Sequence, residues 1–143
     1  MKILLTLIFF ATVIFASDSS DNLRIKILEK IITEISVDKK TKVWSDNKNI
    51  LRSLKEHNKL ETTDNCEDAT IIILQEYDNL IKACSSRAIF VLKYKLLSDI
   101  PHSFGALFWK KGRPNIVIIK SRIKAQSIQV SNDLKPYLED KVW

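Results

Sequence analysis

Glycine is scarce in this chain of 143 residues, which contains only Gly105 and Gly112. A loop that cradles phosphate groups needs several closely spaced glycines, because the backbone must approach the phosphates. The sequence therefore excludes a glycine-rich nucleotide-binding loop. It also lacks a Gly-x-Ser-x-Gly segment, the turn that carries the nucleophile of many serine hydrolases.

Histidine is equally rare, and His57 and His102 stand far apart. Neither has a histidine or cysteine at the spacing by which a helix or turn presents metal ligands, so we expect no metal site. Glu67-Asp68 and Glu139-Asp140 are adjacent acidic pairs. We interpret them as solvated or capping charges, because neighbours in sequence rarely converge on one proton. We therefore predict a non-enzymatic protein with no cofactor and no catalytic residues.

The first residues have the order of a secretory signal peptide. Met1-Lys2 is positively charged, residues 3–15 are apolar apart from two threonines, and Ala16-Ser17 offers a small-residue cleavage site. The apolar run is shorter than the roughly 18 to 20 residues of a membrane span. We expect cleavage of residues 1–16 to leave residues 17–143 as one periplasmic domain without a membrane span. A retained anchor and a buried N-terminal helix are the alternatives.

The formal net charge is +6 at pH 7, and the loss of Lys2 on cleavage would lower it by only one unit. Basic residues are scattered, with modest clusters at 39–40, 110–113 and 120–124. This distribution is typical of a solvated surface, with an acidic partner or an anionic membrane surface as the other interpretation. Export argues against a nucleic-acid partner.

Hydrophobic periodicity predicts alternating helices and strands. Residues 69–74 and 87–92 are apolar almost throughout, as expected of strands that are buried on both faces of a parallel sheet. Further segments are predicted as helices at 20–36, from 47 onwards, at 76–84, 121–126 and 133–140, as short strands at 42–44 and 59–63, and as a loop or short helix at 94–102.

Residues 105–120 are predicted to form a β-hairpin. Apolar runs flank Lys110-Lys111-Gly112-Arg113-Pro114, in which Gly112 can supply the positive φ of a tight turn. The strands are too apolar to lie open to water, so we expect them at the edge of a larger covered sheet. The whole order predicts an α/β fold, a three-layer sandwich with a mostly parallel central sheet ending in an antiparallel β-hairpin.

The two cysteines should lie at the same edge of that sheet. Cys66 precedes the strand at 69–74, and Cys84 ends the helix predicted to return from it, so both thiols are expected where the strand begins. In an exported protein this arrangement favours a Cys66–Cys84 disulfide. Two buried free thiols and a redox-active pair are the alternatives, although the spacing is far from Cys-x-x-Cys.

The carboxyl ends of the predicted parallel strands offer one candidate binding site, because ligands of open α/β sheets bind there. These ends carry Trp44, Asp46, Gln75 and Tyr94. The four residues could bind a small polar ligand or a loop of a partner protein. The alternative is that they are ordinary capping and loop residues.

The hairpin offers a second candidate site. It places Trp109 beside Lys110, Lys111 and Arg113, and an exposed aromatic ring next to arginine is typical of protein-binding surfaces. Packing of the aromatic side chains into the core is the alternative.

Residues 66–138 carry a further pattern. Gly105 begins a strand, Gly112 lies in the turn and Ala125 lies in the next predicted helix. The chain then closes through Ile128, Val130, Ser131 and Leu134. In this pattern, and in the cysteine before the strand at 69–74, the chain resembles the YfiR-like family of small periplasmic regulatory proteins.

The resemblance implies an α/β sandwich that often dimerises. It also implies a periplasmic repressor that binds the sensor domain of an inner-membrane diguanylate cyclase and so restrains cyclic-di-GMP synthesis. We therefore expect an exported regulatory or binding protein whose partner is a membrane-bound signalling protein. The alternative function is that of a small periplasmic solute-binding protein that uses the strand-end cleft. Trp109 and Arg113 should matter for the first function, and Asp46 and Tyr94 for the second.

Overall fold

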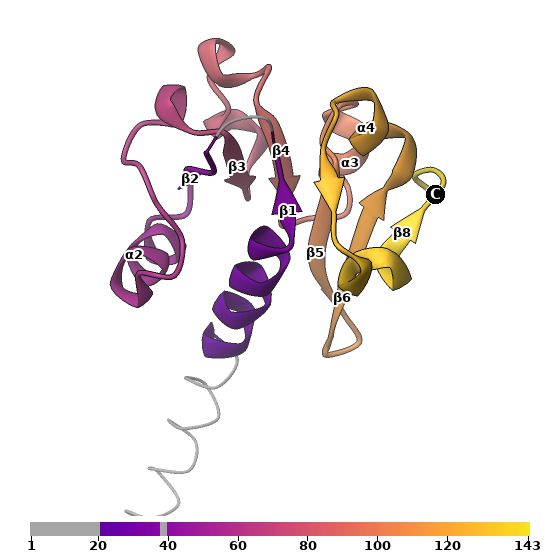
Figure 1. Cartoon of the computed structure of the whole chain (residues 1–143), viewed down its shortest axis with the longest axis horizontal. Coiled ribbons are helices and arrows are strands. Elements are labelled where there is room, and N and C mark those ends of the chain that lie inside the picture. Colours follow the sequence, from indigo (N-terminus) through magenta and orange to yellow (C-terminus); the bar gives the residue numbers. More distant parts are fainter. Residues whose placement is uncertain (1–20, 38–39) are drawn as a thin grey trace, which may run out of the picture.

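The structure is a computed structural model that describes residues 21–37 and 40–143, so the predicted signal peptide lies outside the described residues. Its six-stranded sheet has the order β2-β3-β4-β5-β6-β8, and β1 pairs with β7 in a separate ribbon (Figure 1). The strands are β1 (Ile35–Ser36), β2 (Val43–Ser45), β3 (Ile71–Leu74), β4 (Ala88–Val91), β5 (Gly105–Lys110), β6 (Arg113–Ile119), β7 (Gln129–Val130) and β8 (Leu138–Glu139).

The helices are short apart from the first two. A helix over residues 21–33 precedes β1, and α2 (Lys48–His57) joins β2 to β3. The Asn47 side chain begins α2 by accepting hydrogen bonds from the backbone N–H groups of Asn49 (3.0 Å) and Ile50 (3.1 Å). The others are α3 (Leu96–Asp99), α4 (Lys120–Ala125) and the 3₁₀ turns Cys66–Asp68, Tyr77–Asn79, Lys82–Cys84 and Asn132–Tyr137.

Strand pairing confirms the predicted α/β fold. β2, β3, β4 and β5 pair in parallel, and β5 and β6 form the antiparallel hairpin. Its turn has positive φ at both central residues, 53° at Lys111 and 76° at Gly112. Such a turn matches the twist of the flanking strands, and Gly112 adopts it without steric cost.

Two cores cover the two faces of the sheet, as alternation along a strand requires. In β3, Ile71 and Ile73 pack with the helix at 21–33 and with α2, whereas Ile72 and Leu74 pack with α3 and the two cysteines. All four residues are fully buried. The sheet therefore forms the middle of three layers.

Two predicted helices are wrong. Within residues 76–84 the structure has two 3₁₀ turns, Tyr77–Asn79 and Lys82–Cys84, in place of a helix. Leu80 and Cys84 pack on the second core, whereas Tyr77 and Ile81 remain half exposed. Residues 133–140 form a 3₁₀ turn and the strand β8. Pro136 lies in this segment, where its missing N–H and its ring oppose a regular α-helix.

Three smaller predictions need correction. The first helix ends at residue 33 rather than near Ser36, because Ile35 and Ser36 pair with β7. The strand predicted at 59–63 is a single bridge between Thr62 and Val43. The hairpin does not form the whole edge of the sheet, since β8 pairs with the end of β6.

Candidate functional site

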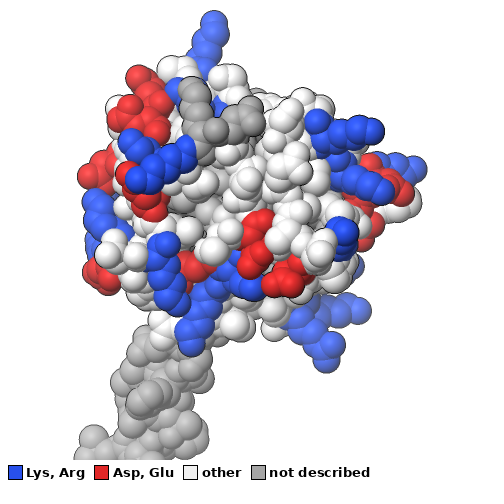
Figure 2. Space-filling model, in the orientation of Figure 1, with Lys and Arg blue, Asp and Glu red and all other residues white. Residues whose placement is uncertain are grey.

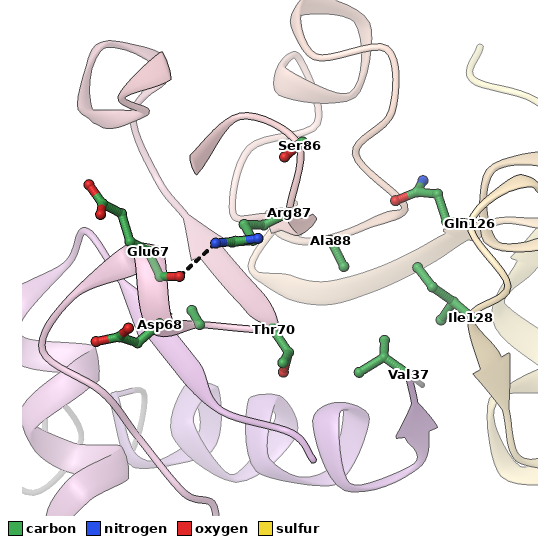
Figure 3. A pocket seen from close by; sticks show the side chains of 10 residues that line it. Val37, Glu67, Asp68, Thr70, Ser86, Arg87, Ala88, Gln126 and Ile128 are labelled. Atoms are coloured by element: carbon green, nitrogen blue, oxygen red, sulfur yellow. Dashed lines mark hydrogen bonds between the residues drawn. The ribbon is translucent and has the colours of Figure 1, made fainter. Parts of the chain in front are cut away.

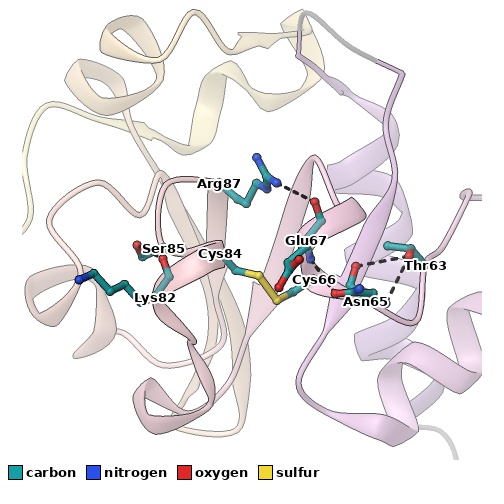
Figure 4. The surroundings of a disulfide bond; sticks show 8 residues. All are labelled: Thr63, Asn65, Cys66, Glu67, Lys82, Cys84, Ser85 and Arg87. Carbon is teal, nitrogen blue, oxygen red and sulfur yellow. Dashed lines mark hydrogen bonds between the residues drawn. A yellow bond between two sulfur atoms is a disulfide. The ribbon is translucent and has the colours of Figure 1, made fainter.

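The predicted disulfide is present. The sulfur atoms of Cys66 and Cys84 are bonded, and their Cα atoms lie 6.0 Å apart (Figure 4). Both cysteines lie in 3₁₀ turns at the amino edge of the sheet, the edge that the sequence predicted. Arg87 joins the same two segments again, because its Nη2 donates a hydrogen bond of 2.6 Å to the carbonyl oxygen of Glu67. The disulfide is consistent with an oxidising, exported compartment.

A cavity of about 470 Å³ opens beside the disulfide (Figure 3). Glu67, Asp68 and Arg87 form its polar wall, and Val37 and Ile128 contribute apolar surface. It lies at the amino ends of β3 and β4, opposite the edge at which we predicted a ligand cleft. The Arg87 guanidinium is held by the Glu67 carbonyl, and its Nε is buried without a hydrogen-bond partner. Nη2 is therefore engaged with the turn that carries Glu67, while the cation still forms part of the cavity wall.

Only two of the four carboxyl-end candidates, Asp46 and Gln75, are joined by a hydrogen bond. The Asp46 carboxylate accepts hydrogen bonds from the backbone N–H groups of Gln75 (2.8 Å) and Glu76 (3.0 Å) and from Asn79 Nδ2 (2.9 Å). The side chain of Trp44 is half-buried against the second core. Asp46 and Gln75 are thus neighbours, as expected, and their polar groups brace the loop after β3.

Tyr94, the fourth of these candidates, lies against the hairpin instead. Its ring meets the Phe108 ring edge-on, with centroids 5.1 Å apart. Its hydroxyl accepts a hydrogen bond of 2.9 Å from the backbone N–H of Trp143. The packing brings a residue predicted for the ligand cleft to the residues predicted for partner binding.

An aromatic groove of about 520 Å³ results, which we define by Tyr94, Phe108, Trp109, Lys110, Glu139 and Trp143. β6 adds Asn115 and Val117 to its wall. The side chain of Trp143 is 79% exposed and that of Trp109 is 40% exposed. Since side chains alternate along β5, Phe108 and Trp109 project from opposite faces of the hairpin, so each face of the hairpin end carries an aromatic ring.

The hairpin turn is basic and unpaired. Lys110, Lys111 and Arg113 are exposed, and no ion pair in the described part of the chain involves them. Figure 2 shows basic side chains projecting from this end of the molecule. The positive charge of the turn is therefore available to an acidic group of another molecule.

A second hollow, of about 270 Å³, lies on the other face of β6, and we call it the helix-side hollow. Its apolar lining is Ile27, Ile31, Ile116, Leu134 and Tyr137. Lys26 and Lys30 from the first helix and Asp133 also line it.

Ion pairs fix the walls of this hollow. Lys30 Nζ lies 3.0 Å from Glu34 Oε1 and 3.1 Å from Asp133 Oδ2, and both acceptors raise the pKa of the lysine. The pKa of the Glu34 carboxyl is lowered, first by Ser131 and then by Lys30. The contact with the Ser131 hydroxyl is looser than a full hydrogen bond. These groups join the helix at 21–33 to the segment before β8.

The residues that sequence reasoning missed come from distant parts of the chain. Tyr94 and Trp143 are 49 positions apart, and no local pattern predicts that they meet. Phe108 could have been included, because alternation along the hairpin places it opposite Trp109.

Residues 21–37 and 40–143 contain neither a metal-binding cluster nor a membrane-spanning helix. No group of three or more His, Cys, Asp and Glu side chains lies close enough together to hold a metal ion. No helix there has the length and apolar character needed to cross a membrane.

No family model matches the chain, and no curated protein matches it.

Proposed function

We propose that this chain is an exported, non-enzymatic binding protein that regulates a membrane-bound signalling protein by contact through its hairpin end. The observation that carries this proposal is the combination of aromatic side chains on both faces of the hairpin with an unpaired basic turn. Aromatic residues and arginine dominate the binding energy of many protein interfaces, where a partner buries them. An open groove and a projecting turn suit a macromolecule better than a small solute.

The partner we propose is the periplasmic sensor domain of an inner-membrane diguanylate cyclase. The resemblance to the YfiR-like family supports this partner, and the disulfide supports the export that such a contact requires. Binding would restrain cyclic-di-GMP synthesis without any chemistry in this chain.

The test is complementation of a strain that lacks the gene. Deletion should raise cyclic-di-GMP, and the wild-type gene should return it to the starting level. The double variant Trp109→Ala/Arg113→Ala should fail to restore it although the protein accumulates normally in the periplasm. The control variant Asp46→Ala, at the opposite strand-end loop, should restore it. Full activity of the hairpin variant, or unchanged cyclic-di-GMP on deletion, would overturn the proposal.

Solute binding is the second candidate function, and the cavity at the amino edge favours it, since its polar wall carries both signs of charge. A ligand that binds only the folded state raises the melting temperature through linkage. A screen of small polar molecules against the oxidised protein should then give a shift that Arg87→Ala abolishes. If Arg87→Ala fails to restore cyclic-di-GMP whereas Trp109→Ala/Arg113→Ala restores it, the cavity and not the hairpin end carries the function.

A further inference from the structure

We propose that the outer edge of β6 accepts an added β-strand, and that its occupant is an extended acidic segment of the partner protein with apolar residues at alternate positions. This inference rests on the proposed function, because it specifies how the same hairpin end takes hold of its partner.

The outer edge of β6 is only partly covered. β6 runs from Arg113 to Ile119, and β8 pairs with its last two residues alone, Ile118 and Ile119. The hairpin continues past the end of β8 (Figure 1). Residues 113–117 therefore have β5 on one side and no strand on the other, and the 3₁₀ turn Asn132–Tyr137 reaches this part of β6 at the hollow beside Ile116. An edge without a neighbouring strand is the arrangement that peptide strands use when they extend a sheet.

The hydrogen-bonding pattern shows which backbone groups face that open edge. The N–H of Ile119 donates to the carbonyl oxygen of Phe104 (2.8 Å), which makes Gly105 and Ile118 a non-hydrogen-bonded pair. Such pairs alternate with hydrogen-bonded ones, so Ile116 and Pro114 also belong to non-hydrogen-bonded pairs. The N–H and C=O of Ile116 and the C=O of Pro114 thus point away from β5, where an added strand would meet them.

The two hollows lie on opposite faces of this edge. Ile116 belongs to the helix-side hollow, whereas Asn115 and Val117 belong to the aromatic groove. Successive side chains of a strand point to opposite faces. A strand beside β6 with apolar residues at alternate positions would therefore direct all of them to one face, towards Ile116 and the apolar lining of the helix-side hollow. Its acidic residues would point to the other face, where Lys110 lines the aromatic groove.

The positive charge around the open edge of β6 favours an acidic occupant. Lys110, Lys111 and Arg113 stand unpaired at the turn, and Lys26 is exposed at the helix-side hollow. Acidic side chains at the ends of the added strand would meet these cations, which favours an acidic segment. The same cations, together with Pro114 and its missing N–H, oppose edge-to-edge pairing with a second copy of this chain, because lysine and proline at a sheet edge block self-association.

The experiment titrates the oxidised mature protein with a synthetic nine-residue peptide in which Asp or Glu alternates with Val, and follows tryptophan fluorescence. A second peptide carries Lys at every acidic position. The key variant is Ile116→Pro, which removes the outward N–H and leaves the β5 ladder intact because that N–H does not face β5. Ile116→Ala is the matched control, since it loses the same side chain and keeps the donor.

We expect the acidic peptide to bind and the basic peptide to fail. Loss of one backbone hydrogen bond should weaken Ile116→Pro about three- to tenfold more than Ile116→Ala. Hydrogen exchange of the Ile116 amide in the wild-type protein should slow when the peptide is bound, a measurement that does not depend on the folding of any variant.

Three results would overturn the inference. The first is that Ile116→Pro and Ile116→Ala bind the acidic peptide equally and the Ile116 amide stays unprotected, and the second is that both peptides bind equally. The third is a doubled mass in sedimentation that Ile116→Pro abolishes, which would assign the edge to a second copy of this chain. The proposed function fails separately. Suppose that Trp109→Ala/Arg113→Ala blocks regulation in cells, whereas Ile116→Pro and Ile116→Ala give the same cyclic-di-GMP level and the same peptide affinity. The hairpin then binds the partner through side chains alone, and the proposed function stands without the added strand.

Discussion

The parallel half of the sheet (β2, β3 and β4) and the hairpin half (β5 and β6) are made of similar apolar residues, yet they are covered to different extents. Every residue of β3 is buried, whereas β5 is buried only from Gly105 to Leu107 and becomes exposed at Trp109. The hairpin strands are longer and extend past the end of β8 (Figure 1). We infer that the parallel half stabilises the fold and that the projecting end of the hairpin carries recognition.

The disulfide provides the largest test of this division. Cys66→Ser/Cys84→Ser removes a bond between residues 18 apart, and the chain-entropy model predicts a loss of about 3 kcal/mol in the free energy of unfolding. Urea denaturation of the oxidised wild type and the variant measures it. Since the bond lies at the parallel half, binding through the hairpin should survive under conditions in which the variant is folded. Lost binding by a folded variant would show that the two halves are coupled.

Gly105 marks the point at which the two halves join, because it pairs with β4 on one side and with β6 on the other. A Cβ atom there would lie 2.7 Å from the Val117 carbonyl oxygen and 3.0 Å from Cε2 of Phe90. Gly105→Ala should therefore cost about 1 to 3 kcal/mol in urea denaturation, the usual range for overpacking.

Gly112→Ala is the matched control for this substitution, since the turn has open space and the cost arises only from its φ of 76°. We expect it to cost about 1 to 2 kcal/mol, the usual cost of an L-residue in the left-handed region. A larger loss at Gly112 than at Gly105 would place the sensitive part of the hairpin at its turn and contradict the division.

Sequence patterns predicted the parallel half well and the hairpin end only in part. The unbroken apolar runs at 71–74 and 88–91 are local signals of strands buried on both faces, and the structure confirms them. The disulfide followed from the position of each cysteine relative to those strands, although the helix predicted between them is wrong.

The aromatic groove and the open edge could not be predicted because they depend on tertiary packing. Tyr94 was assigned to the strand-end cleft by its place after β4, yet its ring turns to Phe108 and its hydroxyl to Trp143. The edge of β6 is left open because β8 is only two residues long, and this segment was predicted as a helix. A single proline, Pro136, opposes that helix and so helps to determine how much of β6 is covered.

Trp109→Ala should lower the free energy of unfolding less than Gly105→Ala or Gly112→Ala. The side chain is 40% exposed, so its removal should cost about 0.5 to 1 kcal/mol, as for a substitution near the surface. Affinity for the acidic peptide should fall much more, because the exposed part of the ring is buried only in the complex. Thermal denaturation and fluorescence titration of the same sample measure both quantities. A loss above about 2 kcal/mol would place Trp109 in the core instead.

The smallest expected effect concerns the wall of the helix-side hollow and its dependence on pH. The pKa of the Glu34 carboxyl is lowered from an ordinary value of 4.5 by Ser131 and Lys30. A lowered pKa in the folded state means that the ionised carboxyl adds stability above pH 4.5, and that this contribution disappears as the pH falls through the folded-state pKa. Wild-type protein should therefore exceed Glu34→Gln in melting temperature at pH 7, and the difference should vanish in acid. Because the Lys30 side chain is exposed, salt should shrink the difference at pH 7. A difference that persists in acid and in salt would mean that Glu34 acts through packing, and its ion pair with Lys30 would then contribute nothing to holding this wall of the hollow.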